Sequence, residues 1–146
     1  MSKAAIRILW AEDSISDILL IKEAFRQAGL KHRLNVVSNG VEALDFLFRR
    51  ARYTHALAPE LVILDLNMPK KSGREVIQEI KTDPDLSRIP LVVLTSSSGD
   101  QNVLEGLDPK RCTYLVKPAT FDALVELAKQ INSFWLSIQQ YRNNTA

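Results

Sequence analysis

Several features that are common in secreted, membrane and nucleic-acid-binding proteins are scarce in this sequence. Its 146 residues include a single cysteine, Cys112, so no internal disulfide can form. No apolar run approaches the roughly 18 residues that a membrane-spanning helix needs. Nineteen basic and seventeen acidic residues leave a net charge of +2, which is too small to indicate a nucleic-acid partner. We therefore expect a cytoplasmic protein that binds neither membranes nor nucleic acid.

Short apolar runs alternate with longer amphipathic segments along the chain. The runs occupy residues 5–11, 34–37, 61–64, 91–95 and 113–116. Nearly continuous Val, Ile and Leu over four to six residues is typical of strands buried on both faces, as in a parallel sheet. Apolar residues recur at helical spacing over 16–28, 41–48, 72–81 and 120–141, and a weaker helix follows Asp100. The pattern predicts one α/β domain over residues 1–146, with a parallel sheet and a last helix that ends near Tyr141.

Residues whose side chains can react or bind a metal stand at the ends of the predicted strands. Four strands are followed by or end in such residues, which are Glu12, Asp13, Asp65, Thr95 and Lys117. Right-handed crossovers bring the carboxyl ends of parallel strands to one edge of the sheet. Three carboxylates at that edge repel one another and need a cation, and Mg²⁺ suits a few hard oxygen ligands plus water. Taken singly, each residue has a simpler explanation; Asp13, for instance, could cap the following helix.

Four segments, AEDS, LDLNMPKKSG, LTSS and YLVKP, stand in this order between about Ile6 and Ile131. Together they resemble the receiver domain of two-component response regulators. The resemblance implies a doubly wound, five-stranded (βα)5 sheet of the flavodoxin-like type. It also implies a switch that accepts a phosphoryl group on an aspartate from a histidine kinase. We expect no enzymatic activity beyond self-phosphorylation and self-dephosphorylation.

The resemblance also assigns a role to each motif residue. It makes Asp65 the phosphoacceptor and Lys117 the partner of the phosphoryl group. Thr95 becomes the switch hydroxyl and Tyr114 the switch aromatic, while Pro118 stands where the family usually has a cis peptide bond. The implied ligands of Mg²⁺ are Asp13, Asp65, the backbone carbonyl oxygen of Asn67 and, mainly through water, Glu12.

The insert at 49–59 and the ending INSFWLSIQQY resemble the small regulators that pair with bacterial phytochromes, so a phytochrome kinase is an expected partner. A last helix of 22 residues would be about 33 Å long, whereas a strand typically spans ~17–20 Å. Its final turns would project beyond the sheet, yet they are too apolar for a solvated extension. We expect a two-fold homodimer that buries Phe134, Trp135 and Ile138. The alternative is that these turns fold back over the domain's own edge.

Other interpretations of the motifs stay open. A degenerate receiver could act as an interaction scaffold without phosphorylation. A phosphatase that uses an aspartyl phosphate would need a second acid where Asn67 stands. An FMN carrier of the same fold would place an anion beside Glu12 and Asp13, which would repel it. Trp10, next to this acidic pair, is expected to be a packing residue, with a lid or partner contact as the alternative.

Overall fold

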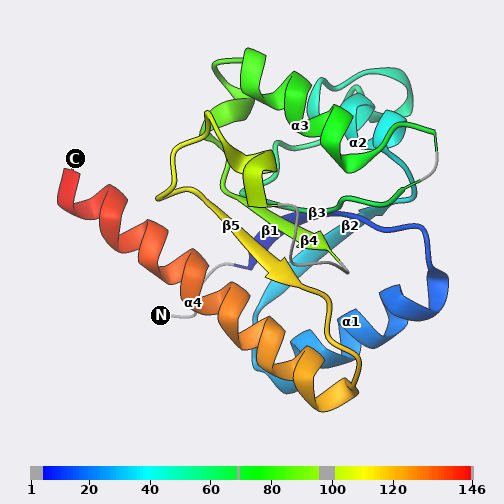
Figure 1. Cartoon of the computed structure of the whole chain (residues 1–146), viewed down its shortest axis with the longest axis vertical. Helices are drawn as coiled ribbons and strands as arrows, with labels where there is room; N and C mark the ends of the chain where they lie inside the picture. The colour runs from blue at the N-terminus through cyan, green and yellow to red at the C-terminus, as the bar shows by residue number, and fades with distance from the viewer. Residues whose placement is uncertain (1–4, 69, 96–100, 146) are drawn as a thin grey trace.

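Five parallel strands form one sheet within the residues that the structure describes. The computed structural model describes residues 5–68, 70–95 and 101–145. The strands are β1 (Ile6–Ala11), β2 (His32–Val37), β3 (Leu61–Asp65), β4 (Leu91–Thr95) and β5 (Cys112–Val116). Their order is β2-β1-β3-β4-β5 (Figure 1). The predicted doubly wound parallel sheet is therefore confirmed, and its order reverses between β1 and β3, where such sheets place their sites.

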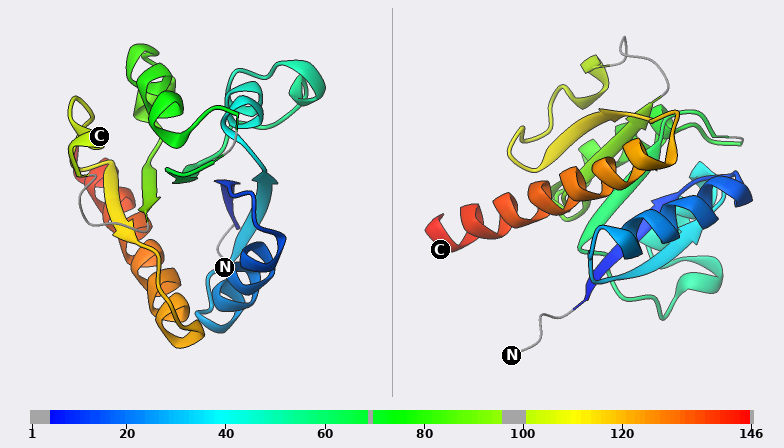
Figure 2. Two further views of the ribbon diagram at one scale, coloured as in Figure 1. Left: turned by 45° about the vertical axis from the view of Figure 1, so that its right-hand side comes forward. Right: turned by 90° about the horizontal axis from the view of Figure 1, so that it is seen from below.

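Helices cover both faces of the sheet. One face carries α1 (Ile15–Gln27) and α4 (Phe121–Thr145), and the other carries α2 (Gly40–Leu47) and α3 (Gly73–Thr82) (Figures 1 and 2). Three 3₁₀ turns complete the described elements, namely η1 (Ala51–Tyr53), η2 (Leu86–Arg88) and η3 (Gln101–Leu104). The helix expected after Asp100 is, within the described residues, only η3. Gly106 has φ +92° and Pro109 follows soon after, so the segment cannot continue as an α-helix.

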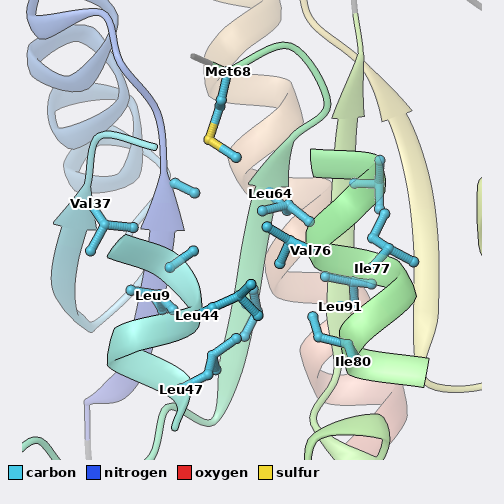
Figure 3. Close-up of a cluster of buried hydrophobic side chains, with 14 of the residues drawn as sticks. Leu9, Val37, Leu44, Leu47, Leu64, Met68, Val76, Ile77, Ile80 and Leu91 are labelled. Carbon is cyan, nitrogen blue, oxygen red and sulfur yellow. The ribbon is translucent and has the colours of Figure 1, made fainter. Parts of the chain in front are cut away.

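The central strands alternate their side chains between two apolar clusters. Leu9 of β1 faces α2 and α3, whereas Ile8 and Trp10 face α1 and α4. Figure 3 shows the first cluster, in which α2 and α3 side chains meet those of the sheet. Its labelled members are Leu9, Val37, Leu44, Leu47, Leu64, Met68, Val76, Ile77, Ile80 and Leu91. Burial on both faces explains the continuous apolar runs of β1, β3 and β4.

Side-chain caps fix where the first three α-helices begin. The capping oxygens belong to Ser14, Asn39 and Ser72, and each accepts the backbone N–H three residues later. Such caps satisfy one of the unpaired N–H groups of the first turn. Ser14 thus caps α1, and the simpler explanation for Asp13 as the cap of this helix was wrong.

The last helix is longer than predicted and is partly covered by its own domain. It runs to Thr145, 25 residues in all, because no glycine or proline follows Tyr141 to stop it. The side chain of Tyr141 lies outside the described residues. Trp135 is 8% exposed and Ile138 only 1%, so neither needs a second copy of the chain to cover it. None of the helices in the described part of the chain combines the length and apolar character that crossing a bilayer requires.

Candidate functional site at the carboxyl edge of the sheet

A hollow lies where β1, β3 and β5 end. Its lining consists of Glu12, Asp13, Ser14, Asp17, Asp65, Asn67 and Lys117. Glu12 and Asp13 directly follow β1, Asp65 is the last residue of β3, and Lys117 directly follows β5. The sheet order brings these ends together although the residues are far apart in the sequence. Four of the five predicted strand-end residues therefore share one hollow.

Lys117 joins the two buried carboxylates of the hollow. Its Nζ lies 2.6 Å from Oδ2 of Asp65 and 2.8 Å from Oε1 of Glu12. The side chains of Asp65 and Glu12 are only 5% and 1% exposed, whereas that of Lys117 is 27% exposed. Charge-assisted hydrogen bonds of this length are the stronger kind in proteins. They offset part of the cost of burying two anions side by side.

The same contacts shift the pKa values of this group. Burial raises the pKa of Glu12, and the hydrogen bond from Lys117 offsets only part of that rise. Burial on its own would lower the pKa of Lys117, but the hydrogen bonds to Asp65 and Glu12 outweigh it and raise that pKa. Lys117 is therefore held as the ammonium ion at neutral pH.

Backbone N–H groups orient both carboxylates. Oδ1 of Asp65 accepts the N–H of Asn67 at 2.9 Å, and Oε2 of Glu12 accepts the N–H of Ser14 at 3.3 Å. Each carboxylate thus has one oxygen on Lys117 and the other on a backbone donor. Asp65 is held at the tip of its strand with little freedom to rotate.

The loop between β3 and α3 packs closely on two glycines. The N–H of Gly40 donates to the carbonyl oxygen of Lys71 at 3.0 Å. A Cβ atom on Gly40 would lie 2.1 Å from that oxygen, and one on Gly73 would lie 2.5 Å from the carbonyl oxygen of Asp65. A larger residue at either position would therefore force the neighbouring backbone to shift, and α2 holds the loop that carries Asn67.

The hollow has the chemistry of a site for a hard divalent cation. Four carboxylates and one ammonium line it, so negative charge is in excess. No three His, Cys, Asp or Glu side chains within the described ranges lie close enough to hold a metal by themselves. Mg²⁺ fits such a site because it takes one or two carboxylates and keeps several waters. Asp13, Asp65 and the carbonyl oxygen of Asn67, with Glu12 beyond a water, would hold it.

Two predicted residues lie outside the hollow. Thr95 is fully buried at the end of β4, and its carbonyl oxygen accepts the N–H of Lys117 at 2.7 Å. Tyr114 of the neighbouring strand is half-buried and packs against the cluster under α2 and α3. The odd-numbered residues of β4 and the even-numbered residues of β5 point toward that cluster. Thr95 and Tyr114 therefore lie on the same face of the sheet. The peptide bond before Pro118 is trans.

One acidic residue of the hollow escaped sequence reasoning. Oδ2 of Asp17 lies 3.9 Å from Nζ of Lys117, and its side chain is 48% exposed. Asp17 stands in the first turn of α1, five residues after Glu12. Because Ser14 starts the helix, its first turn carries Asp17 back toward the strand end. The sequence signal that could have revealed Asp17 was its position in the first helical turn directly after the acidic pair Glu12 and Asp13.

Trp10 is a core residue, which confirms the simpler expectation for it. It is 1% exposed, and its ring lies 5.5 Å from that of Phe25 between centroids. Its indole therefore forms part of the packing between the sheet and α1.

Comparison with known proteins places this geometry in a family. Residues 8–129 match the response regulator receiver domain. Response regulator Rcp1 of Synechocystis is 40% identical over 129 residues, which are 88% of this chain and 88% of Rcp1.

Solved structures agree with the sequence match. The phosphorylated cyanobacterial phytochrome response regulator RcpA superposes with a TM-score of 0.79 at 40% identity, covering 92% of this chain and 96% of RcpA. The Mn²⁺-bound form of Rcp1 has a TM-score of 0.78 at 40% identity, covering 90% and 94%. The hollow of carboxylates and one lysine at the strand ends agrees with the match over residues 8–129. This chain therefore belongs to the response regulator receiver domain family.

Proposed function

We propose that Asp65 accepts a phosphoryl group from a histidine kinase. The observation that carries the proposal is the 2.6 Å contact of Lys117 with Asp65, in a hollow that Glu12 shares. A carboxylate oxygen can attack phosphorus to form an acyl phosphate, while the bond from phosphorus to the donor breaks and its electron pair leaves with the donor. Such transfer needs positioning and charge neutralisation more than covalent chemistry. Lys117 supplies one positive charge at that point.

Mg²⁺ is the proposed cofactor, held by Asp13, Asp65 and the carbonyl oxygen of Asn67, with Glu12 beyond a water. When bound, it would neutralise charge on the phosphoryl oxygens. The chain itself fixes the two carboxylate oxygens of Asp65: the N–H of Asn67 donates to one of them, and the ammonium of Lys117 donates to the other. The Mn²⁺-bound structure of Rcp1 supports a divalent ion in this family.

The proposed response passes through Thr95 and Tyr114. A phosphoryl group adds about two negative charges beside the end of β4. The hydroxyl of Thr95 would turn to donate to it, and the side chain of Tyr114 would take the space that Thr95 leaves. Both residues face the same side of neighbouring strands, which supports this coupling.

A mass measurement tests the acceptor. Acetyl phosphate with Mg²⁺ should add the mass of one phosphoryl group to the wild-type chain, and the Asp65→Asn variant should gain none. Asp17→Asn is the matched control, because it removes a carboxylate from the same hollow and should still be labelled. Labelling of Asp65→Asn would assign the acceptor elsewhere. Absence of labelling in the wild type would favour the scaffold, and steady release of phosphate without an adduct would favour the phosphatase.

The proposed phosphodonor is a phytochrome histidine kinase in the cytoplasm. The likeness to RcpA and Rcp1 supports the phytochrome pairing. Exposed apolar residues of α1 begin beside the hollow, with Ile15 76% and Leu19 63% exposed, and they suit a partner helix that delivers the phosphoryl group. Transfer from an autophosphorylated phytochrome kinase should be faster than from a chemotaxis kinase. Equal rates would exclude a dedicated pairing.

A homodimer through β5 and α4 is the remaining part of the proposal. β5 is an edge strand, and Val116 at its end is 47% exposed. Phe134 of α4 is half-buried and lines a hollow with Cys112 and Thr113 of β5, so apolar surface is left beside an edge that could pair. Sedimentation at micromolar concentration should show a dimer, and Phe134→Glu should give a monomer that still accepts phosphate. A wild-type monomer at high concentration would refute this interface.

A further inference from the structure

The carboxylate of Glu42, in the first turn of α2, joins this helix to the β2–α2 loop and to the insert at 49–59. Its Oε2 accepts the backbone N–H of Ser38 at 2.9 Å and the hydroxyl of Ser38 at 3.1 Å. The N–H of Glu42 itself donates to Oδ1 of Asn39 at 2.9 Å. Together these contacts fix the start of α2, as a capping box does. The other carboxylate oxygen, Oε1, accepts a hydrogen bond from Nη2 of Arg52 at 3.2 Å.

The fold of the insert holds Arg52 against α2. The guanidinium of Arg52 donates to the hydroxyl of Tyr53 at 2.8 Å, and its Cζ lies 5.0 Å from the centre of that ring. Tyr53 in turn packs on Phe46 of α2, with 5.1 Å between the ring centroids. Arg49 and Ala51 have φ of +55° and +53°, a left-handed conformation that is unfavourable for residues other than glycine. Such strain persists only where the surrounding contacts impose it, so the turn has one specific shape.

The start of α2 in turn holds the loop between β3 and α3. The N–H of Gly40 donates to the carbonyl oxygen of Lys71, which belongs to this loop, at 3.0 Å. Lys70 of the same loop acts on Glu42 through its charge. The backbone hydrogen bond from Ser38, and to a smaller degree the ammonium of Lys70, hold the pKa of Glu42 below its usual range. Glu42 is therefore an anion at neutral pH and is linked to this loop through the backbone and through charge.

We propose that Glu42 is a positioning residue for the metal site and that the insert holds it in place through Arg52. The loop that Gly40 contacts carries Asn67, whose N–H orients Asp65 at 2.9 Å and whose carbonyl oxygen is a proposed ligand of Mg²⁺. Mg²⁺ requires nearly ideal octahedral geometry, so a small displacement of one ligand lowers its affinity. The effect on the ion rests on the proposed function, whereas the effect on the loop does not.

The position of the loop can be measured without metal. In a ¹⁵N-labelled sample with EDTA, Arg52→Met and Glu42→Gln should shift the amide signal of Asn67, because the start of α2 loses its contact with the insert. Arg50→Met is the matched control, since Arg50 belongs to the same insert but pairs with Asp45 at 3.4 Å. It should leave the Asn67 signal in place. A signal that moves equally in all three variants, or in none, overturns the proposal.

Calorimetric titration with Mg²⁺ measures the effect on the ion. Arg52→Met should weaken binding about three- to tenfold, less than the roughly 10- to 100-fold loss typical of residues that contact a metal ligand directly. Removing a positive charge would by itself strengthen cation binding, so weaker binding reflects the position of the loop. Arg50→Met removes the same charge and should not weaken binding. Unchanged or tighter binding in Arg52→Met would contradict the positioning role.

A double-mutant cycle tests whether Arg52 acts through Glu42. Arg52→Met combined with Glu42→Gln should bind Mg²⁺ no more weakly than Glu42→Gln alone, because both changes break the same contact. Arg52→Lys keeps a cation beside Glu42 and should bind more tightly than Arg52→Met. Additive losses would show that the insert does not act through Glu42.

Labelling by acetyl phosphate separates positioning from general damage. The Mg²⁺ concentration that gives half the maximal rate should rise in Arg52→Met, while the rate at saturating Mg²⁺ should stay close to that of the wild type. A lower maximal rate with an unchanged Mg²⁺ requirement would overturn the positioning role. A wild-type chain that binds Mg²⁺ but is not labelled would refute the proposed phosphoryl transfer and leave the positioning role intact.

Discussion

Replacing Lys117 by methionine should destabilise the metal-free protein by about 3 kcal/mol. The ammonium lies 2.6 Å from Asp65 and 2.8 Å from Glu12, whose side chains are 5% and 1% exposed. Removing one partner of a buried ion pair costs about 3–5 kcal/mol, because the other charge stays buried and unpaired. The low end applies here, since the Lys117 side chain is 27% exposed and Glu12, whose pKa burial already raises, can take up a proton.

Urea unfolding in EDTA, followed by circular dichroism, measures this loss. Lys129→Met is the matched control, because Lys129 pairs with Glu126 at 3.1 Å on the surface and should lose less than about 1 kcal/mol. Mg²⁺ should then stabilise Lys117→Met more than the wild type, since no ammonium competes for the carboxylates. A loss below about 1 kcal/mol for Lys117→Met would refute the reasoning, because the two carboxylates would then not depend on Lys117.

Two further predictions concern pH and the loop that carries Asn67. The pKa of Lys117 is raised above its ordinary 10.5, so its contribution to stability is complete below pH 10.5 and is lost as the pH rises through the folded value. Stability should therefore fall more steeply above that pH in the wild type than in Lys117→Met, and parallel curves would contradict this. Gly40→Ala should weaken Mg²⁺ binding in a calorimetric titration and cost about 2 kcal/mol, because a clash at 2.1 Å with the carbonyl of Lys71 outweighs the helix propensity of alanine. Val41→Ala, an exposed neighbour, should leave both quantities nearly unchanged, and equal behaviour of the two variants would argue against the close approach.

The sheet and the convergence of site residues could be predicted because both follow from local patterns. Continuous apolar runs indicate strands buried on both faces, and parallel strands place their carboxyl ends at one edge. Glu12, Asp65 and Lys117 meet for that reason alone. Their individual roles, by contrast, came from the family resemblance and stay proposals for this chain.

Tertiary packing explains what the sequence did not predict. The apolar turns of α4 looked unpartnered because their distance from the sheet was judged from helix length, yet Trp135 contacts the cluster that includes Ile6 and Leu30. The fourth crossover has the composition of a weak helix, but the left-handed conformation of Gly106 ends it early. Asp17 was overlooked because its approach to Lys117 depends on Ser14, rather than Asp13, starting α1.

The hydrogen bond from the N–H of Lys117 to the carbonyl oxygen of Thr95, at 2.7 Å, has a mechanical consequence. It ties the residue that contacts Asp65 to the strand end that carries Thr95, whose hydroxyl is the proposed switch. Any movement of either residue strains the same rung of the β4–β5 ladder. Since β5 is the edge strand of the sheet, no further strand lies beyond it, and a displacement of β5 changes the exposed edge directly. Lys117, which contacts Asp65, and Thr95 are thus joined by a single hydrogen bond of this ladder. A protein bound at the β5 edge would respond to the state of Asp65 without a conformational change that passes through the core.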